Sequence, residues 1–247
     1  MNRSNRAKVV AFGWLLLFPA LPEITTAQDL ATPILISGKH GNRLVFTPRS
    51  NARVEINAYV TERHKILDNL ADRSPNEVIE AQVSYSHYLN KTELLDTINK
   101  YRTQTLSLNL GWGEQVGGYE IKKHEPVEHA INNAAFHHTM FVNELYESAH
   151  NEFQQNTQEI ISPEALERLS THLAHAKELK VQLEKRGVLF YGARIKGRTS
   201  EIRRIKDTDK LIRLVDPIWA EDTGSVEIIN SKRISVPLSP YQYESSH

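Results

Sequence analysis

The stretch that decides the fold is residues 188–217, VLFYGARIKGRTSEIRRIKDTDKLIRLVDP. Its first eight residues are apolar and aromatic enough to predict a β-strand. A short helix with Ile202 and Ile205 on one side follows, and then a second apolar run that ends at Asp216-Pro217. A crossover of this length makes the two strands parallel, so we expect a helix to cover one face of a sheet.

A second unit of the same kind precedes it. Asn90 and Glu93 have the spacing of a capping box, in which each side chain accepts a hydrogen bond from an unpaired backbone N–H at the start of a helix. The helix, over residues 92–101, lies between two period-two patterns typical of strands. In the second pattern, Thr105 and Ser107 are expected on an exposed face. Two such units predict an α+β fold with a ferredoxin-like split βαβ sheet, with strands near 78–89, 103–110, 188–196 and 210–216.

The long segment between the two units, residues 120–187, is strongly helical in pattern and predicts an inserted two-helix hairpin. Its first helix is expected over about residues 126–153. Ser162 caps the second helix, and Gly187 ends it. The predicted domain, residues 76–217, therefore contains a sheet with a helical insertion.

The flanking segments carry weaker patterns. Residues 28–75 predict an N-terminal extension with a hairpin of short strands at 34–36 and 44–46, an alternating strand at 54–60 and a short helix at 62–71. Residues 218–247 predict a C-terminal hairpin, with strands at 226–229 and 234–236, followed by a polar tail.

The first 27 residues predict a signal peptide, because basic residues precede an apolar stretch and a small-x-small cleavage pattern ends at Ala27. The predicted destination is secreted or extracytoplasmic, with a bacterial origin as the simpler assumption. The alternative is an uncleaved membrane anchor over residues 9–21, although this stretch is short for a membrane span and contains prolines.

Composition excludes several classes of function. Thirty basic residues balance thirty acidic ones, so the chain has no overall field for nucleic acid or an anionic membrane. The sequence has no cysteine, which excludes disulfides, thiolate metal sites and cysteine nucleophiles. No phosphate-binding glycine loop and no GxSxG nucleophile motif is present.

Histidine is concentrated in the predicted insertion, which holds seven of the eleven histidines. Imidazole binds zinc and other transition metals, and two facing helices can build such a site. His137, His172 and His175 are the candidate ligands. The simpler interpretation is a solvated helix face without a cofactor, because no established ligand motif is present.

Two further features are candidate contacts with a partner. Trp112 and Tyr119 lie in a predicted glycine-rich loop, where they either meet a partner or cap the sheet edge. Arg203 and Arg204 belong to a local basic cluster that either binds a polyanion of the cell envelope or forms an ordinary solvated face.

Residues 190–195, FYGARI, with the helix and apolar run that follow them, resemble the second βαβ half of subtilisin propeptide-like inhibitor modules. The resemblance covers about thirty residues of mostly hydrophobic pattern, which many unrelated folds share. It implies the same split sheet and suggests protease binding. The chain differs from those modules in its long helical insertion and in having no protease domain after it.

These patterns favour an exported, non-enzymatic binding or regulatory module whose partner is a protein or a cell-envelope component. One alternative is a metal-binding or metal-dependent protein that uses the histidines of the insertion. The other is a membrane-tethered extracytoplasmic sensor or regulator, if the N-terminal segment is retained.

Overall fold

The computed structural model describes residues 34–38, 41–45, 51–112, 115–157, 162–221 and 224–225. Contacts divide the chain into Met1–Leu30 and Ala31–His247, and every described residue belongs to the second unit. Its elements, in chain order, are β1 (Ile34–Gly38), β2 (Gly41–Val45), α1 (Asn51–Arg73), β3 (Val78–Leu89), α2 (Lys91–Asn99), β4 (Gln104–Trp112), β5 (Gln115–Glu120), α3 (Val127–Asn156), α4 (Pro163–Arg186), β6 (Phe190–Arg198), α5 (Thr199–Thr208), β7 (Ile212–Ala220) and β8 (Gly224–Ser225).

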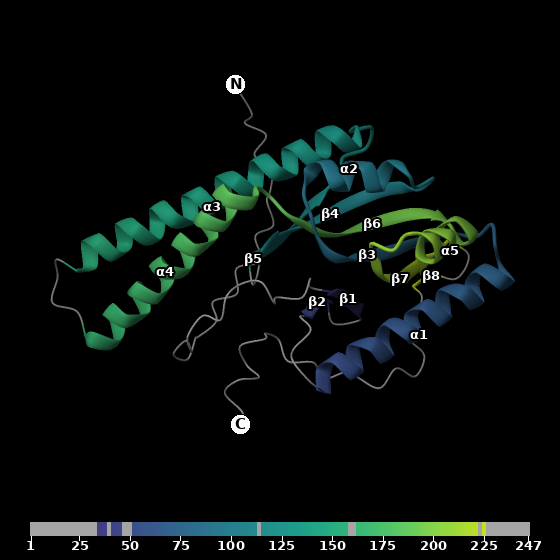
Figure 1. Cartoon of the computed structure of the whole chain (residues 1–247), viewed down its shortest axis with the longest axis horizontal. Coiled ribbons are helices and arrows are strands. Elements are labelled where there is room, and N and C mark those ends of the chain that lie inside the picture. Colours follow the sequence, from purple (N-terminus) through teal and green to yellow (C-terminus); the bar gives the residue numbers. More distant parts are fainter. Residues whose placement is uncertain are drawn as a thin grey trace, which may run out of the picture. The chain divides into compact units, whose positions relative to one another are not determined.

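The main sheet is antiparallel throughout, with strand order β5-β4-β6-β3-β7-β8 (Figure 1). The predicted α+β class is therefore confirmed. Strand β6 lies between β3 and β4, and β3 lies between β6 and β7, so the units β3-α2-β4 and β6-α5-β7 interleave. The predicted hairpin near the N-terminus is present as the pair β1–β2, which forms a small sheet of its own.

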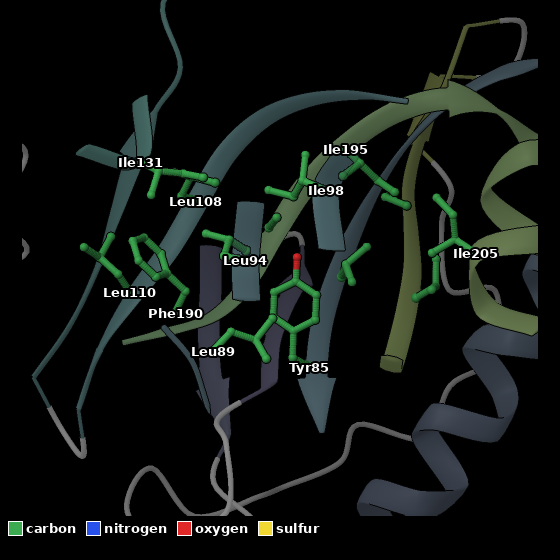
Figure 2. Close-up of a cluster of buried hydrophobic side chains, with 14 of the residues drawn as sticks. Tyr85, Leu89, Leu94, Ile98, Leu108, Leu110, Ile131, Phe190, Ile195 and Ile205 are labelled. Carbon is green, nitrogen blue, oxygen red and sulfur yellow. The ribbon is translucent and has the colours of Figure 1, made fainter. Parts of the chain in front are cut away.

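Helices α2 and α5 bury their apolar residues in the same core (Figure 2). The capping box of α2 is formed as predicted, because Asn90 Oδ1 accepts from the Glu93 N–H at 3.0 Å and Glu93 Oε2 accepts from the Asn90 N–H at 2.9 Å. Leu94 of α2 and Ile202 of α5 are fully buried against the strands. Burying each such side chain contributes about 1.5–3 kcal/mol to stability.

The two longest helices, α3 and α4, pack against each other (Figure 1). Their charged contacts run in opposite directions along the two helices, since Glu147 faces Lys180 while Glu152 faces His172. The pair is therefore antiparallel. Ser162 caps α4 through its side chain, and Gly187 ends the helix with a φ of 70°, both as predicted.

The predicted strand at residues 54–60 is wrong, because that segment is part of one continuous helix, α1, which also contains the short helix predicted at 62–71. Its buried residues recur every three or four positions, as on one side of a helix: Ile56, Tyr59, Arg63, Leu67 and Ala71. The alternation at 54–60 was misleading because its polar members include Tyr59, which packs inward.

Three smaller predictions also fail. Asp216-Pro217 does not end the last strand, because β7 continues to Ala220 past a register shift, and a bulge is a place where a strand tolerates proline. Most of the loop predicted after residue 112 is instead a further strand, β5, at the edge of the sheet. Thr105 and Ser107 are buried, although their strand face is polar. The strands predicted at 226–229 and 234–236 lie outside the described residues.

Candidate protein-binding surface

At one end of the sheet, β7 pairs with the two-residue strand β8 at Trp219 and Ala220, and helix α1 covers the outer side of β7 around Val215 and Pro217. The Val215 N–H donates to His64 Nε2 at 3.0 Å, and Arg63 Nη2 donates to the carbonyl of Pro217. Residues 215 and 217 are two apart in the strand, so their backbone groups point to the same side. The side chains of α1 therefore bond the groups with which a further strand would otherwise pair. A helix that covers a strand edge in this way prevents edge-to-edge association.

The contact between α1 and β7 is also ionic. Arg63 Nε pairs with Asp216 Oδ1, and the Tyr59 hydroxyl donates to Asp216 Oδ2 at 2.6 Å, with all three side chains buried. Burial raises the pKa of Asp216, although Arg63 and Tyr59 oppose that shift. Desolvation and the Asp216 carboxylate raise the pKa of Tyr59. This network joins α1 to β7.

The other edge, β5, shows no comparable cover among the described residues. The Ile121 N–H donates to the Leu106 carbonyl at 2.9 Å. The pairs Leu108–Tyr119 and Leu110–Gly117 follow at steps of two residues, so their backbone groups also face each other. Since alternate residues of an antiparallel strand bond the same neighbour, the backbone groups of residues 116, 118 and 120 point outward. Gly117 and Gly118 are both exposed and have no side chains of their own to shield this edge.

Next to β5 lies a row of side chains that we call the aromatic ledge, formed by Tyr119, His137, Phe136 and Met140. The ring of Tyr119 stacks on that of His137 with centroids 6.3 Å apart, and His137 meets Phe136 edge-on at 5.7 Å. Met140 follows Phe136 by one helical turn. The ledge therefore links the edge strand, through Tyr119 and His137, to the exposed residues of α3.

The ledge is held at its base by Glu125. The Tyr119 hydroxyl donates to Glu125 Oε1 at 2.9 Å, Asn133 Nδ2 donates to the same oxygen at 2.8 Å, and the Lys122 N–H donates to Oε2 at 3.0 Å. Desolvation acts to raise the pKa of Glu125, but these hydrogen bonds outweigh it and lower the pKa. Burial and the bond to Glu125 raise the pKa of Tyr119, which stays a neutral donor.

The outer end of the ledge is unusually apolar for a surface. Phe136 is 61% exposed and Met140 43% exposed, and Phe141 beside them is 41% exposed. Among the described residues, the only other large apolar side chain with comparable exposure is Leu166, on α4. Single exposed apolar residues are normal, but a cluster of them beside an open strand edge is typical of an interaction site.

Trp112, the other aromatic candidate, is packed in place. It is the last residue of β4, its ring lies 5.0 Å from that of Tyr88, and the guanidinium of Arg186 lies 4.8 Å above it. It borders a cavity of about 20 Å³ between the sheet and the helix pair, which is room for one water molecule. Trp112 thus joins α4 to the sheet through Arg186.

The two candidate arginines have different surroundings. Arg203 forms an ion pair with Asp72 of α1, which, like the pair between Lys206 and Asp68, fastens α5 to α1. Arg204 is exposed and lines a shallow cavity of about 180 Å³ at the C-terminal ends of α2 and α5. This volume is below the range of about 300–1,000 Å³ usual for small-molecule sites.

The candidate metal ligands are not brought together. His137 is stacked in the aromatic ledge, whereas His172 Nδ1 lies 4.0 Å from Glu152 Oε2 in an exposed contact between α3 and α4. His175 lies on α4, three residues from His172. Among the described residues, no group of three or more His, Asp or Glu side chains is placed to hold a metal ion.

Sequence reasoning identified Tyr119 but missed Phe136, Met140 and the open edge of β5. The signal in the sequence was the presence of apolar residues at 136 and 140, off the buried side of a long amphipathic helix. Comparison with protein-family models, curated proteins and solved structures finds no match to this chain. In the described part of the chain, no helix is both long and apolar enough to cross a membrane.

Proposed function

We propose that the protein is an exported, non-enzymatic binding module that contacts another polypeptide through the aromatic ledge and the edge of β5. The observation that carries the proposal is a strand edge whose outward backbone groups bond no described residue, linked through the rings of Tyr119 and His137 to the exposed Phe136 on α3. An extended segment can gain main-chain hydrogen bonds from such an edge and side-chain burial from the ledge.

The fold assignment belongs to the same proposal. We infer that β4, β6, β3 and β7, with α2 and α5, form a ferredoxin-like split sheet, and that α3 and α4 are a helical hairpin inserted in it. The strand order and the interleaving of the two units support this assignment. The proposal that the protein is exported depends on the signal-like residues 1–27. A mature N-terminus at Gln28 would show that this segment is cleaved and would exclude the alternative, in which residues 9–21 anchor the protein in a membrane.

Replacing both Phe136 and Met140 by serine tests the proposed surface. Covering a large apolar side chain contributes about 1.5–3 kcal/mol, so loss of the two should weaken binding at least tenfold. Leu166→Ser is the matched control, because Leu166 is about as exposed as Met140 but lies on another helix.

The readout is recovery of envelope proteins on the immobilised full chain, quantified by mass spectrometry. The proposal predicts at least one protein that the wild type and Leu166→Ser recover and the double variant loses. Equal recovery by all three chains contradicts it. The metal alternative has a separate test: one zinc ion per untagged chain in elemental analysis would support it.

A further inference from the structure

We propose that the occupant of the β5 edge is a second copy of this chain, paired antiparallel about a two-fold axis that passes between the two Gly118 residues. The inference rests on the proposed function, because it identifies the polypeptide that the same surface binds. Its basis is the register of β5 on β4, which fixes residues 116, 118 and 120 as the ones whose backbone groups point outward.

The spacing of these residues is self-complementary. Outward-bonding residues pair with each other across an antiparallel ladder, so Gly118 faces Gly118 of the second copy and residue 116 faces Glu120. Both copies then present the same patch, which is the isologous contact of the commonest kind of dimer. The two sheets would join into one through hydrogen bonds at residues 116, 118 and 120.

The side chains in this register also match in size. Gly117 of one copy stands opposite Tyr119 of the other, so an aromatic ring lies across from an exposed position without a side chain. An aromatic residue opposite glycine is a known way to stabilise and fix the register of a strand pair. Nothing lies within 4 Å of a Cβ atom built on Gly117, which leaves space for a neighbouring ring.

Charge does not oppose the pairing. Glu120, whose side chain is 73% exposed, is paired with Arg194 of its own sheet at 2.8 Å. The two Glu120 residues of a dimer would be separated by four residues of strand, about 14 Å, which exceeds the Debye length of about 8 Å. The full chain has 30 basic and 30 acidic residues, and without residues 1–27, which hold three basic residues and one acidic residue, 27 basic and 29 acidic residues remain, so net charge does little to drive two copies apart.

The opposite edge of the sheet supports the choice of β5. On β7, the outward groups at 215 and 217 are bonded by His64 and Arg63, and residues 219 and 220 pair with the two-residue strand β8, so this end of the sheet offers no described edge as long as that of β5. A six-residue strand with a small apolar ledge is modest beside the roughly 800 Å² per partner of a typical stable interface. We therefore expect a reversible dimer whose population rises with protein concentration.

The test is sedimentation velocity of the purified full chain over a wide concentration range. Gly118→Pro removes the outward N–H and leaves the bonds to β4 intact, so it should give a monomer. Gly118→Ala keeps that N–H and should still dimerise, since its Cβ would meet only ordinary contacts, the nearest at 3.7 Å. A wild type that stays monomeric at every concentration, or a folded Gly118→Pro chain that dimerises as well as Gly118→Ala, overturns the inference.

Cysteine cross-linking provides a second measurement, because the natural sequence has no cysteine. In the proposed register the two residues 118 are about 5.5 Å apart at Cα, within disulfide range, whereas the two residues 117 are separated by about 8 Å. Gly118→Cys should therefore form a covalent dimer under mild oxidation, and Gly117→Cys should not. Failure of Gly118→Cys to cross-link, or equal cross-linking of both variants, contradicts the register.

These results are separable from a failure of the proposed function. A monomeric wild type whose recovered partner is lost on replacing Phe136 and Met140 overturns the dimer and leaves the binding surface in place. An extended segment of another protein on β5 would give that outcome. A dimer that forms as described, combined with unchanged recovery of every partner by the double variant, overturns the surface and leaves the dimer.

Discussion

Replacing Arg63 by leucine tests the contact that holds α1 on the sheet. Arg63 and Asp216 are 2% and 1% exposed, and the guanidinium also bonds the carbonyl of Pro217. The substitution leaves a buried carboxylate without its counter-ion and a carbonyl without its donor. Removing one member of a buried ion pair costs about 3–5 kcal/mol, a large part of the stability of an ordinary domain.

Equilibrium unfolding in urea, followed by circular dichroism, measures this loss. Arg203→Leu is the matched control, since it breaks a pair with Asp72 on the surface, where solvent screening leaves such pairs little effect on stability. An unchanged slope with denaturant would show that both variants unfold as the wild type does. A cost for Arg63→Leu no larger than that for Arg203→Leu would refute the argument.

The same variant has a predicted pH dependence. Burial already raises the pKa of Asp216, and loss of Arg63 raises it further. When the pKa of a carboxyl is higher in the folded protein than in the unfolded chain, that carboxyl stabilises the fold fully at a pH below its unfolded-state pKa of about 3.9. This stabilisation is lost as the pH rises through the folded-state pKa. The penalty of Arg63→Leu should therefore shrink as the pH falls. A penalty that grows on acidification would contradict a buried, uncompensated Asp216.

Three further predictions concern single positions. Gly187→Ala should cost about 1–3 kcal/mol in urea unfolding, because φ 70° with ψ −166° is a backbone conformation almost confined to glycine; no measurable loss would contradict it. Asn90→Ala should cost about 1 kcal/mol by removing the cap of α2, whereas exposed Asn99→Ala at the other end of that helix should cost less. His64 should titrate by NMR below its usual value of about 6.5, because burial and then Lys206 lower its pKa. Its contribution to stability is then present above about pH 6.5 and is lost as the pH falls through the folded pKa, so a His64 pKa above 6.5 would be inconsistent with the structure.

The features that the sequence determined are local ones. The capping box at Asn90 and Glu93, the Ser162 cap and the Gly187 stop each depend on residues within a few positions, so their chemistry is readable without the fold. The buried pair Ile202 and Ile205 likewise follows from helical spacing alone. These signals were sufficient to predict an α+β chain with two strand–helix–strand units.

Only the tertiary structure decided the rest, because the deciding partners are far apart in the chain. Residues 54–60 belong to a helix whose inward side chains Tyr59 and Arg63 bind Asp216, more than 150 positions later in the chain. The same long-range contact keeps Asp216-Pro217 inside a strand. His137 became a stacking partner of Tyr119 through the packing of α3 on β5, and spacing within one helix carries no information about such a contact. Hydrophobic period reports which side of an element is buried, whereas the partner on that side is set by how distant segments pack together.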